Sequence, residues 1–126
     1  MNNPVVWFEI YVQDMDRAKA FYESMLSLSL EKLENPGLDI EIEMWSFPME
    51  MEAAGAPGAL VKIKNMPVGV NSVLVYFSCE DCAVEAEKAV AAGGTIEKPK
   101  TSIGQYGHIA LVTDTEGNMI GLHSRA

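Results

Sequence analysis

Few residues of this chain combine a reactive side chain with a position from which it could act. Glu9 is one of them, because it lies inside the apolar run VVWFEIY. A carboxylate on an apolar strand is costly to bury unless it is paired. Glu9 is therefore a candidate general base, or a hydrogen-bond partner for a ligand. The alternative is a structural carboxylate satisfied by Tyr11, Tyr76 or a histidine, and the residues leave both interpretations open.

The two histidines, His108 and His123, are the next candidates. His123 follows Gly121 by two residues and therefore shares its strand face, although it could also be a rim histidine beside a frayed terminus. His108 begins the apolar segment HIALVT, and the sequence does not fix the side to which it points. Glu9, His108 and His123 together supply three donors, the minimum for a catalytic zinc site.

The two cysteines, Cys79 and Cys82, form a Cys-x-x-Cys pattern in SCEDCAVE. This spacing occurs in redox pairs and in half-sites for zinc, but the chain has no second cysteine pair. The acidic neighbours Glu80 and Asp81 disfavour thiolate formation. We expect Cys79 to end a buried strand and Cys82 to lie in the first turn of a helix.

The elements that position these residues occur twice. VVWFEIYVQDMDRAKAFY, from Val5, matches SVLVYFSCEDCAVEAEKA, from Ser72, when Asp14 is aligned with Asp81, an offset of 81 − 14 = 67 residues. Each segment predicts a strand with one apolar face, and then a helix that Asp14 or Asp81 caps. The other face is mixed and carries Trp7, Glu9 and Tyr11 in the first half, and Leu74 and Tyr76 in the second.

Three further strands fit in each half, at about 29–33, 39–46 and 59–64, and at about 95–99, 107–113 and 118–123. The order is βαβββ twice, which predicts an α+β fold. We expect one domain over residues 1–126, with a first module at about 4–64, a linker at 65–71 and a second module at about 72–124.

Composition limits the classes of partner. The 126 residues are 48% apolar and carry a formal net charge of −9, so they can bury a core but would repel nucleic acid. No apolar run approaches the roughly 20 residues that span a bilayer. The first residues lack the features of a signal peptide. We expect a cytoplasmic protein with no nucleic-acid or membrane partner.

The segments FEIYVQDMDRAKAFYESML, LVYFSCEDCAVEAEKAVAAGG and YGHIALVTDTEGNMIGLHS resemble the vicinal oxygen chelate superfamily. This superfamily includes glyoxalase I, extradiol dioxygenases, fosfomycin-resistance enzymes and bleomycin-resistance proteins. The resemblance implies that the two βαβββ modules form a curved, barrel-like mixed sheet around a cavity, with the helices outside. It also implies a homodimer, with or without exchange of modules between chains.

Metal enzymes of this superfamily place ligands at four strand positions. Carried onto this chain, these positions hold Trp7, Leu74 and Gly121, with the fourth near Val61. A shift of a residue or two in the alignment would move the position at Leu74 to Ser72 or Val73. None of Trp7, Val61, Leu74 and Gly121 supplies a useful ligand. Gly121 would then mark a ligand position without a ligand, which leaves room for Trp7 or a bound molecule.

We therefore expect no cofactor and metal-independent binding of a small apolar or aromatic molecule in the sheet cavity, with Glu9 as the candidate catalytic group. The expected lining residues are Trp7, Glu9, Tyr11, Trp45, Tyr76, Gly121 and His123. The alternative is a glyoxalase-like lyase or isomerase with Zn, Ni, Mn or Fe at a shifted site made by Glu9, His108 and His123. A third possibility is an interaction module without a small ligand.

Overall fold

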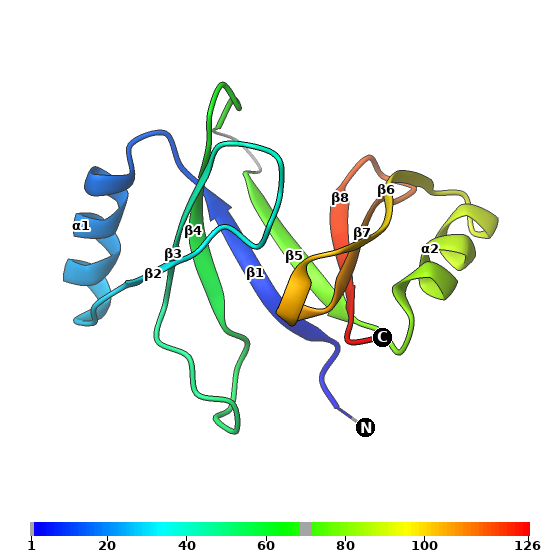
Figure 1. The fold of residues 1–126 in the computed structure, drawn as a ribbon, viewed down its shortest axis with the longest axis horizontal. Helices are drawn as coiled ribbons and strands as arrows, with labels where there is room; N and C mark the ends of the chain where they lie inside the picture. The colour runs from blue at the N-terminus through cyan, green and yellow to red at the C-terminus, as the bar shows by residue number, and fades with distance from the viewer. Residues whose placement is uncertain (1, 69–71) are drawn as a thin grey trace. The chain divides into compact units, whose positions relative to one another are not determined.

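The structure is a computed structural model that describes residues 2–68 and 72–126. Its elements form two βαβββ modules, so the predicted α+β fold is confirmed (Figure 1). Residues 69–71 of the expected linker lie outside the described part. The elements, in chain order, are β1 (Val5–Tyr11), α1 (Met15–Leu26), β2 (Glu31–Leu33), β3 (Ile42–Ser46), β4 (Gly58–Ile63), β5 (Val73–Ser78), α2 (Cys82–Ala91), β6 (Thr95–Ser102), η1 (Gly104–Tyr106), β7 (His108–Thr113) and β8 (Met119–Ser124).

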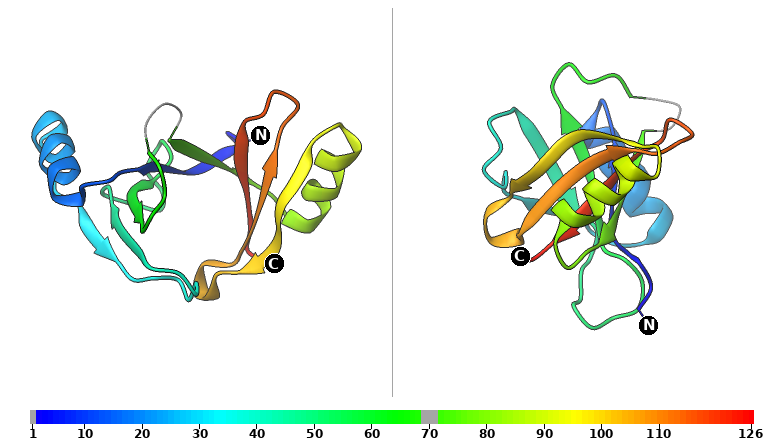
Figure 2. Two further views of the ribbon diagram at one scale, coloured as in Figure 1. Left: turned by 90° about the horizontal axis from the view of Figure 1, so that it is seen from above. Right: turned by 90° about the vertical axis from the view of Figure 1, so that its right-hand side faces the viewer.

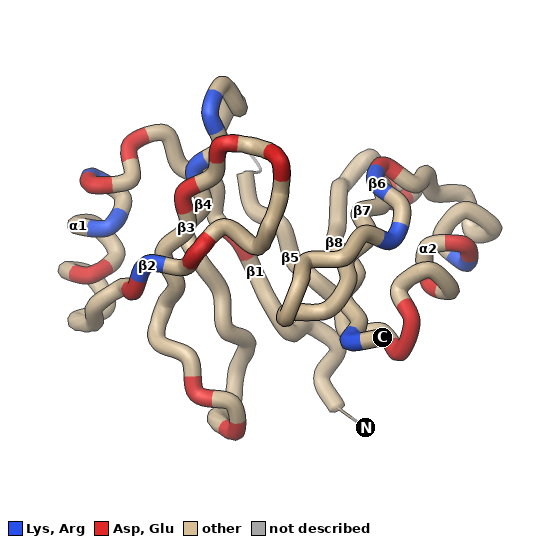
Figure 3. The backbone as a smooth tube through the Cα atoms, viewed as in Figure 1, with Lys and Arg blue, Asp and Glu red and all other residues tan. Residues whose placement is uncertain are grey.

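The described residues divide into two compact units. The first unit comprises residues 7–68 with 72–73, and the second comprises residues 2–6 with 74–126. That the whole chain forms one domain stays a prediction. Acidic residues occur on elements of both units (Figure 3). No helix in the described ranges is long and apolar enough to cross a membrane.

The sheet of the first unit has the strand order β2-β3-β4-β1. β1 runs parallel to β4, with Phe8 opposite Gly58 and Glu9 opposite Ala59, whereas β3 is antiparallel to both β2 and β4. A Cβ atom at Gly58 would overlap the ring of Phe8, so the ring requires glycine on the neighbouring strand. Asp14 caps α1 as predicted, since its Oδ1 accepts the backbone N–H of Arg17 at 3.0 Å.

The two faces of this sheet differ as the repeat predicts. Phe8, Ile10 and Val12 pack with α1 in a cluster around Met15 and Leu60. The opposite face has a second cluster, which Trp7 and Tyr11 join; its buried members are Met44, Ala59 and Val61. The predicted apolar face of β1 is therefore the one that packs on the helix.

The sheet of the second unit has the order β5-β8-β7-β6, and α2 lies against one face of it (Figure 2). β5 is parallel to β8, while β8, β7 and β6 are antiparallel neighbours. Cys79 follows β5 and Cys82 is the first residue of α2, as predicted, and both pack in the α2-side cluster. Asp81 caps α2 through the backbone N–H of Ala83, at 3.0 Å.

Two strand boundaries differ from the prediction for local reasons. β3 begins at Ile42 rather than near residue 39, because the Asn35 side chain holds a turn through the backbone groups of Gly37, Leu38 and Ile40. β6 continues past Pro99 to Ser102, because an edge strand tolerates proline, and its register shifts around that point.

Candidate functional site

Glu9 forms the polar centre of the β1 face that points away from α1. Trp7 Nε1 donates a hydrogen bond to Glu9 Oε2 at 3.1 Å, and the Tyr11 hydroxyl donates to Oε1 at 2.5 Å. These three residues share a face because they alternate along one strand. Glu9 is only 9% exposed, so the carboxyl group is desolvated but each of its oxygens has a donor.

The environment of Glu9 changes its acidity. Burial raises the pKa of its carboxyl group, and the hydrogen bonds from Tyr11 and Trp7 oppose this effect by stabilising the charged form. A carboxyl group with a raised pKa exchanges its proton closer to neutral pH than an exposed one. Glu9 can therefore accept a hydrogen bond or transfer a proton.

The wall around Glu9 is largely apolar, and buried Ser46, which lies opposite Ala59 on β4, adds a second polar side chain to the same face. Met44, Ala59 and Val61 are buried on this face, and Leu33, Ile42 and Ile63 pack against them. Ligand sites commonly combine such a wall with a few polar groups that orient the ligand. Sequence reasoning missed Met44 and Ala59, because only the pairing of β3 with β4 and of β4 with β1 brings them to this face.

Trp45 lies on the opposite face of the sheet. Its neighbour across the strand pair is Leu60, and it packs with the α1-side cluster. The Nζ atom of Lys19 lies 3.2 Å from the centroid of its ring, and its Nε1 donates to Glu43 Oε2 at 2.9 Å. Because Met44 occupies the Glu9 side of β3, the next residue must point the other way. The structure thus corrects the expectation that Trp45 lines the same wall as Glu9.

In the second unit, Tyr76 and Gly121 face each other across parallel strands, on the side away from α2. A Cβ atom at Gly121 would overlap the ring of Tyr76. The missing side chain therefore makes room for the ring of Tyr76, a neighbour that the sequence analysis did not name for this position. In the internal repeat, Tyr76 corresponds to Glu9 (76 − 67 = 9). Tyr76 lies opposite Gly121 and Glu9 lies opposite Ala59, so the residue of the first unit that is equivalent to Gly121 is Ala59 and not Val61.

His123 shares this face and is held by the backbone. Its Nε2 lies 2.6 Å from the carbonyl oxygen of Tyr106, in the short helix before β7. Because a carbonyl only accepts, the neutral imidazole carries its hydrogen on Nε2 and its lone pair on Nδ1. The partnership with Tyr106 was missed, since no sequence pattern places a backbone carbonyl of this turn next to β8.

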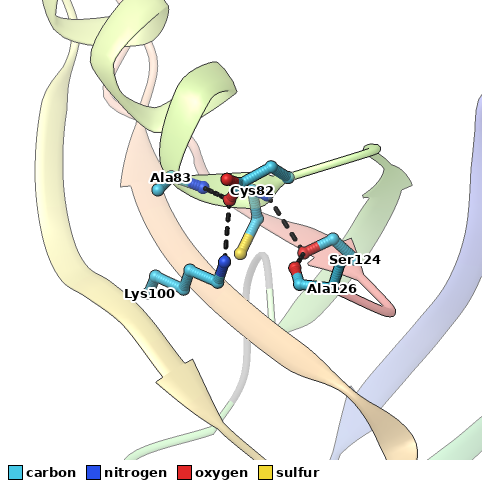
Figure 4. A network of polar contacts seen from close by, with 6 residues as sticks. Cys82, Ala83, Lys100, Ser124 and Ala126 are labelled. Carbon is cyan, nitrogen blue, oxygen red and sulfur yellow. Dashed lines mark hydrogen bonds and ion pairs between the residues drawn. The ribbon is translucent and has the colours of Figure 1, made fainter.

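His108 lies on the other face of the same sheet. It pairs with Ser124, whose Oγ accepts the backbone N–H of Cys82 at 3.0 Å at the start of α2 (Figure 4). The Nδ1 atom of His108 is buried without a partner in the described residues. His108 and His123 therefore point to opposite faces, which corrects the alternative in which both would join Glu9 around one ion.

Other donor sets for a metal do not come together either among the described residues. In the described ranges, no three His, Cys, Asp or Glu side chains are grouped closely enough to hold an ion. Trp7, the first of the expected ligand positions, uses its only polar atom as a donor to Glu9. Val61, Leu74 and Gly121 have no polar side-chain atom, so the four positions do not fit a metal ion.

The chain is similar to known proteins in sequence and in fold. The family model described as Glyoxalase/Bleomycin resistance protein/Dioxygenase superfamily matches residues 5–122. Proteins of Mycobacterium bovis and Mycobacterium tuberculosis, each described as "Putative glyoxylase CFP32", are 28% identical over 116 residues, which is 92% of this chain and 43% of theirs. The chain thus spans less than half the length of these curated relatives.

Similar solved structures come from several proteins. A variant of methylmalonyl-CoA epimerase from Streptomyces coelicolor, in complex with 2-nitronate-propionyl-CoA, has a TM-score of 0.69 at 16% identity, covering 100% of this chain and 99% of that one. The hypothetical protein BH1468 from Bacillus halodurans C-125 has a TM-score of 0.71 at 12% identity, with coverages of 100% and 96%. At these identities the likeness concerns the fold alone.

Proposed function

The chain belongs to the glyoxalase/bleomycin resistance protein/dioxygenase superfamily, and we propose that it binds a small apolar or aromatic molecule against the β1 face formed by Trp7, Glu9 and Tyr11. The observation that carries this proposal is the buried Glu9 carboxyl group, held by two aromatic donors in a largely apolar wall. A group that is costly to desolvate is well placed to orient a ligand.

Glu9 would act as the hydrogen-bond acceptor of this site. A carboxylate has about four acceptor positions, and Trp7 and Tyr11 each use one. A ligand hydroxyl or N–H group could use another while its apolar body covers Val61 and Met44. Taken by itself, the face of the second unit that carries Tyr76, Gly121 and His123 is also proposed as a ligand-contacting surface.

We propose that this binding needs no metal. The residues at the four expected ligand positions do not fit an ion, and His108 and His123 point to opposite faces of their sheet. Elemental analysis of protein purified without chelator tests this proposal. One Zn, Ni, Mn or Fe bound per chain would overturn it, whereas binding of ligand by metal-free protein would support it.

A second candidate function is a metal-free lyase or isomerase reaction in which Glu9 accepts a proton from a substrate carbon and returns it. The raised pKa of the Glu9 carboxyl group favours this candidate, because proton transfer is most efficient when the pKa lies near the working pH. Turnover that is lost in Glu9→Gln while binding persists would distinguish this function from binding alone.

Two further proposals concern the setting of the site. We propose a homodimer, which light scattering on the eluting protein tests directly, since a mass of 13.8 kDa would indicate a monomer. We also propose a cytoplasmic location, which cell fractionation tests.

The binding experiment uses the indole N–H signals of the two tryptophans. Trp7 and Trp45 each donate to a glutamate two residues away, Glu9 and Glu43 respectively. In a Trp45→Phe background, the remaining indole signal in a ¹H–¹⁵N spectrum belongs to Trp7. Titration with indole, p-cresol or catechol, all aromatic molecules with a hydrogen-bond donor, should shift that signal saturably.

Variants then identify the acceptor. Glu9→Gln should weaken the binding of these probes about ten- to hundredfold, the effect of one hydrogen bond to a charged group. Glu43→Gln is the matched control when it is made in the chain that keeps Trp45 and is followed through the Trp7 signal, because it then alters the same kind of pair on the opposite face. It should leave the affinity unchanged. Equal losses in both variants, or no saturable shift with the unaltered chain, would contradict the proposed site.

A further inference from the structure

The first unit has a hollow at the end of β1, next to α1, and Tyr11 is the residue that it shares with the wall around Glu9. It encloses about 510 Å³ and lies where the end of β1 meets the first turns of α1. Ile10 and Ala18 contribute apolar surface from the strand and the helix. Volumes of a few hundred cubic ångströms are typical of sites for small organic ligands.

Large apolar side chains at the edge of this hollow are unusually exposed. Phe21 is 58% exposed on α1, and Val73 is 56% exposed at the start of β5. Val68 is a third apolar residue of the lining. Covering such surface with an apolar molecule is favourable, at about 25 cal/mol for each Å² removed from water.

Arg17 supplies the positive charge of the hollow. Among the described residues its guanidinium group makes no ion pair or side-chain hydrogen bond, although the protein carries a formal net charge of −9. Asp14 also lines the hollow, but its carboxylate already accepts the backbone N–H of Arg17 as the cap of α1. The favourable field at a helix N-terminus offsets part of the charge of such a capping carboxylate.

We propose that this hollow is a second ligand site, which binds a small organic carboxylate with an aromatic or alkyl body. The carboxylate pairs with Arg17, whose planar guanidinium group can donate two parallel hydrogen bonds to it. The apolar body lies against Phe21, Val68 and Val73. This site is additional to the proposed function at Glu9, and it uses a cation where the Glu9 wall offers an acceptor.

The test compares two probes of the same shape, 3-phenylpropanoate and its neutral amide, 3-phenylpropanamide. Each is titrated to about 10 mM into ¹⁵N-labelled full-length chain, a range suited to weak ligands. The carboxylate should shift the backbone signals of Arg17, Phe21 and Val73 saturably. It should bind about three- to tenfold more tightly than the amide, as expected for a partly exposed charge pair.

Three variants define the contacts. Arg17→Gln keeps most of the aliphatic chain and a good helix former, and it should remove the preference for the carboxylate. Lys88→Gln, on an exposed position of α2, is the matched control for the loss of one positive charge and should preserve the preference. Phe21→Ala should weaken both probes alike, because it removes apolar contact only.

The outcomes separate this site from the one at Glu9. Shifts at the hollow that lose their charge preference in Arg17→Gln support the proposal. It is overturned by the absence of saturable shifts, by a preference that survives Arg17→Gln, or by shifts centred on Trp7 and Glu9. Tyr11 contributes to both places, so its signal is not used to assign the site.

Discussion

Replacing Glu9 by glutamine should change how the stability of the protein depends on pH. Burial raises the pKa of the Glu9 carboxyl group in the folded protein above 4.5, its ordinary value, which it regains on unfolding. The folded protein therefore holds this proton more tightly than the unfolded chain. The stabilisation from this group is complete below the unfolded pKa and is lost as the pH rises through the folded pKa.

The size of the effect follows from a single proton. Between the two pKa values, the free energy of unfolding should fall by at most about 1.4 kcal/mol per pH unit for the unaltered chain relative to Glu9→Gln. Above and below this window the difference should be level. For a chain of this length, 1 kcal/mol corresponds to roughly 4 °C in the midpoint of thermal unfolding.

The assay is urea unfolding of both proteins from about pH 8 to about pH 4, a range that includes the unfolded pKa of glutamate. Other carboxyl groups occur in both proteins and largely cancel in the difference. Glu43→Gln controls for the loss of one negative charge beside a tryptophan. As the pH falls, the free energy of unfolding of the unaltered chain should rise relative to that of Glu9→Gln. If this difference stays level or falls instead, the desolvated carboxyl group inferred at this site does not exist.

Three further changes test the surrounding structure. Gly121→Ala should destabilise the protein by about 1–3 kcal/mol because the added methyl group overlaps the Tyr76 ring; in a Tyr76→Leu background a urea double-mutant cycle should show a much smaller loss, and equal losses would contradict the steric account. Ser124→Ala should cost about 1–3 kcal/mol in urea unfolding, because the backbone N–H of Cys82 then lacks its acceptor; an unchanged midpoint would argue against that bond. Burial, and after it the nearby Glu85, raises the pKa of the Cys79 thiol to about 11. Iodoacetamide should therefore modify Cys79 slowly at neutral pH, and the rate, followed by peptide mass spectrometry, should rise about tenfold for each unit of increasing pH until that pKa is reached. Rapid modification at neutral pH would contradict this environment.

The local features of the fold could be predicted from the sequence because they depend on neighbours along the chain. Side chains alternate along a strand, so the run containing Trp7, Glu9 and Tyr11 had to place all three on one face. The helix caps Asp14 and Asp81 follow in the same way, since a cap bonds to backbone groups two or three residues away.

Features that depend on strand pairing could not be predicted. The face of Trp45 is set by the register of β3 on β4, which the sequence does not encode locally. The same holds for His108, whose face is fixed by its pairing with Ser124 on β8. The role of Gly121 needed the parallel pairing of β5 and β8, because the ring that fills its space is 45 residues away in sequence (121 − 76 = 45).

The pairing of a ring with a glycine on the adjacent parallel strand occurs in both units, as Phe8 with Gly58 and Tyr76 with Gly121. Each pair constrains the order in which its members can diverge. A larger residue at either glycine is tolerated only in a lineage where the aromatic partner has already become smaller. Homologues should therefore include chains that have lost a ring and kept the glycine, and the reverse combination should be rare.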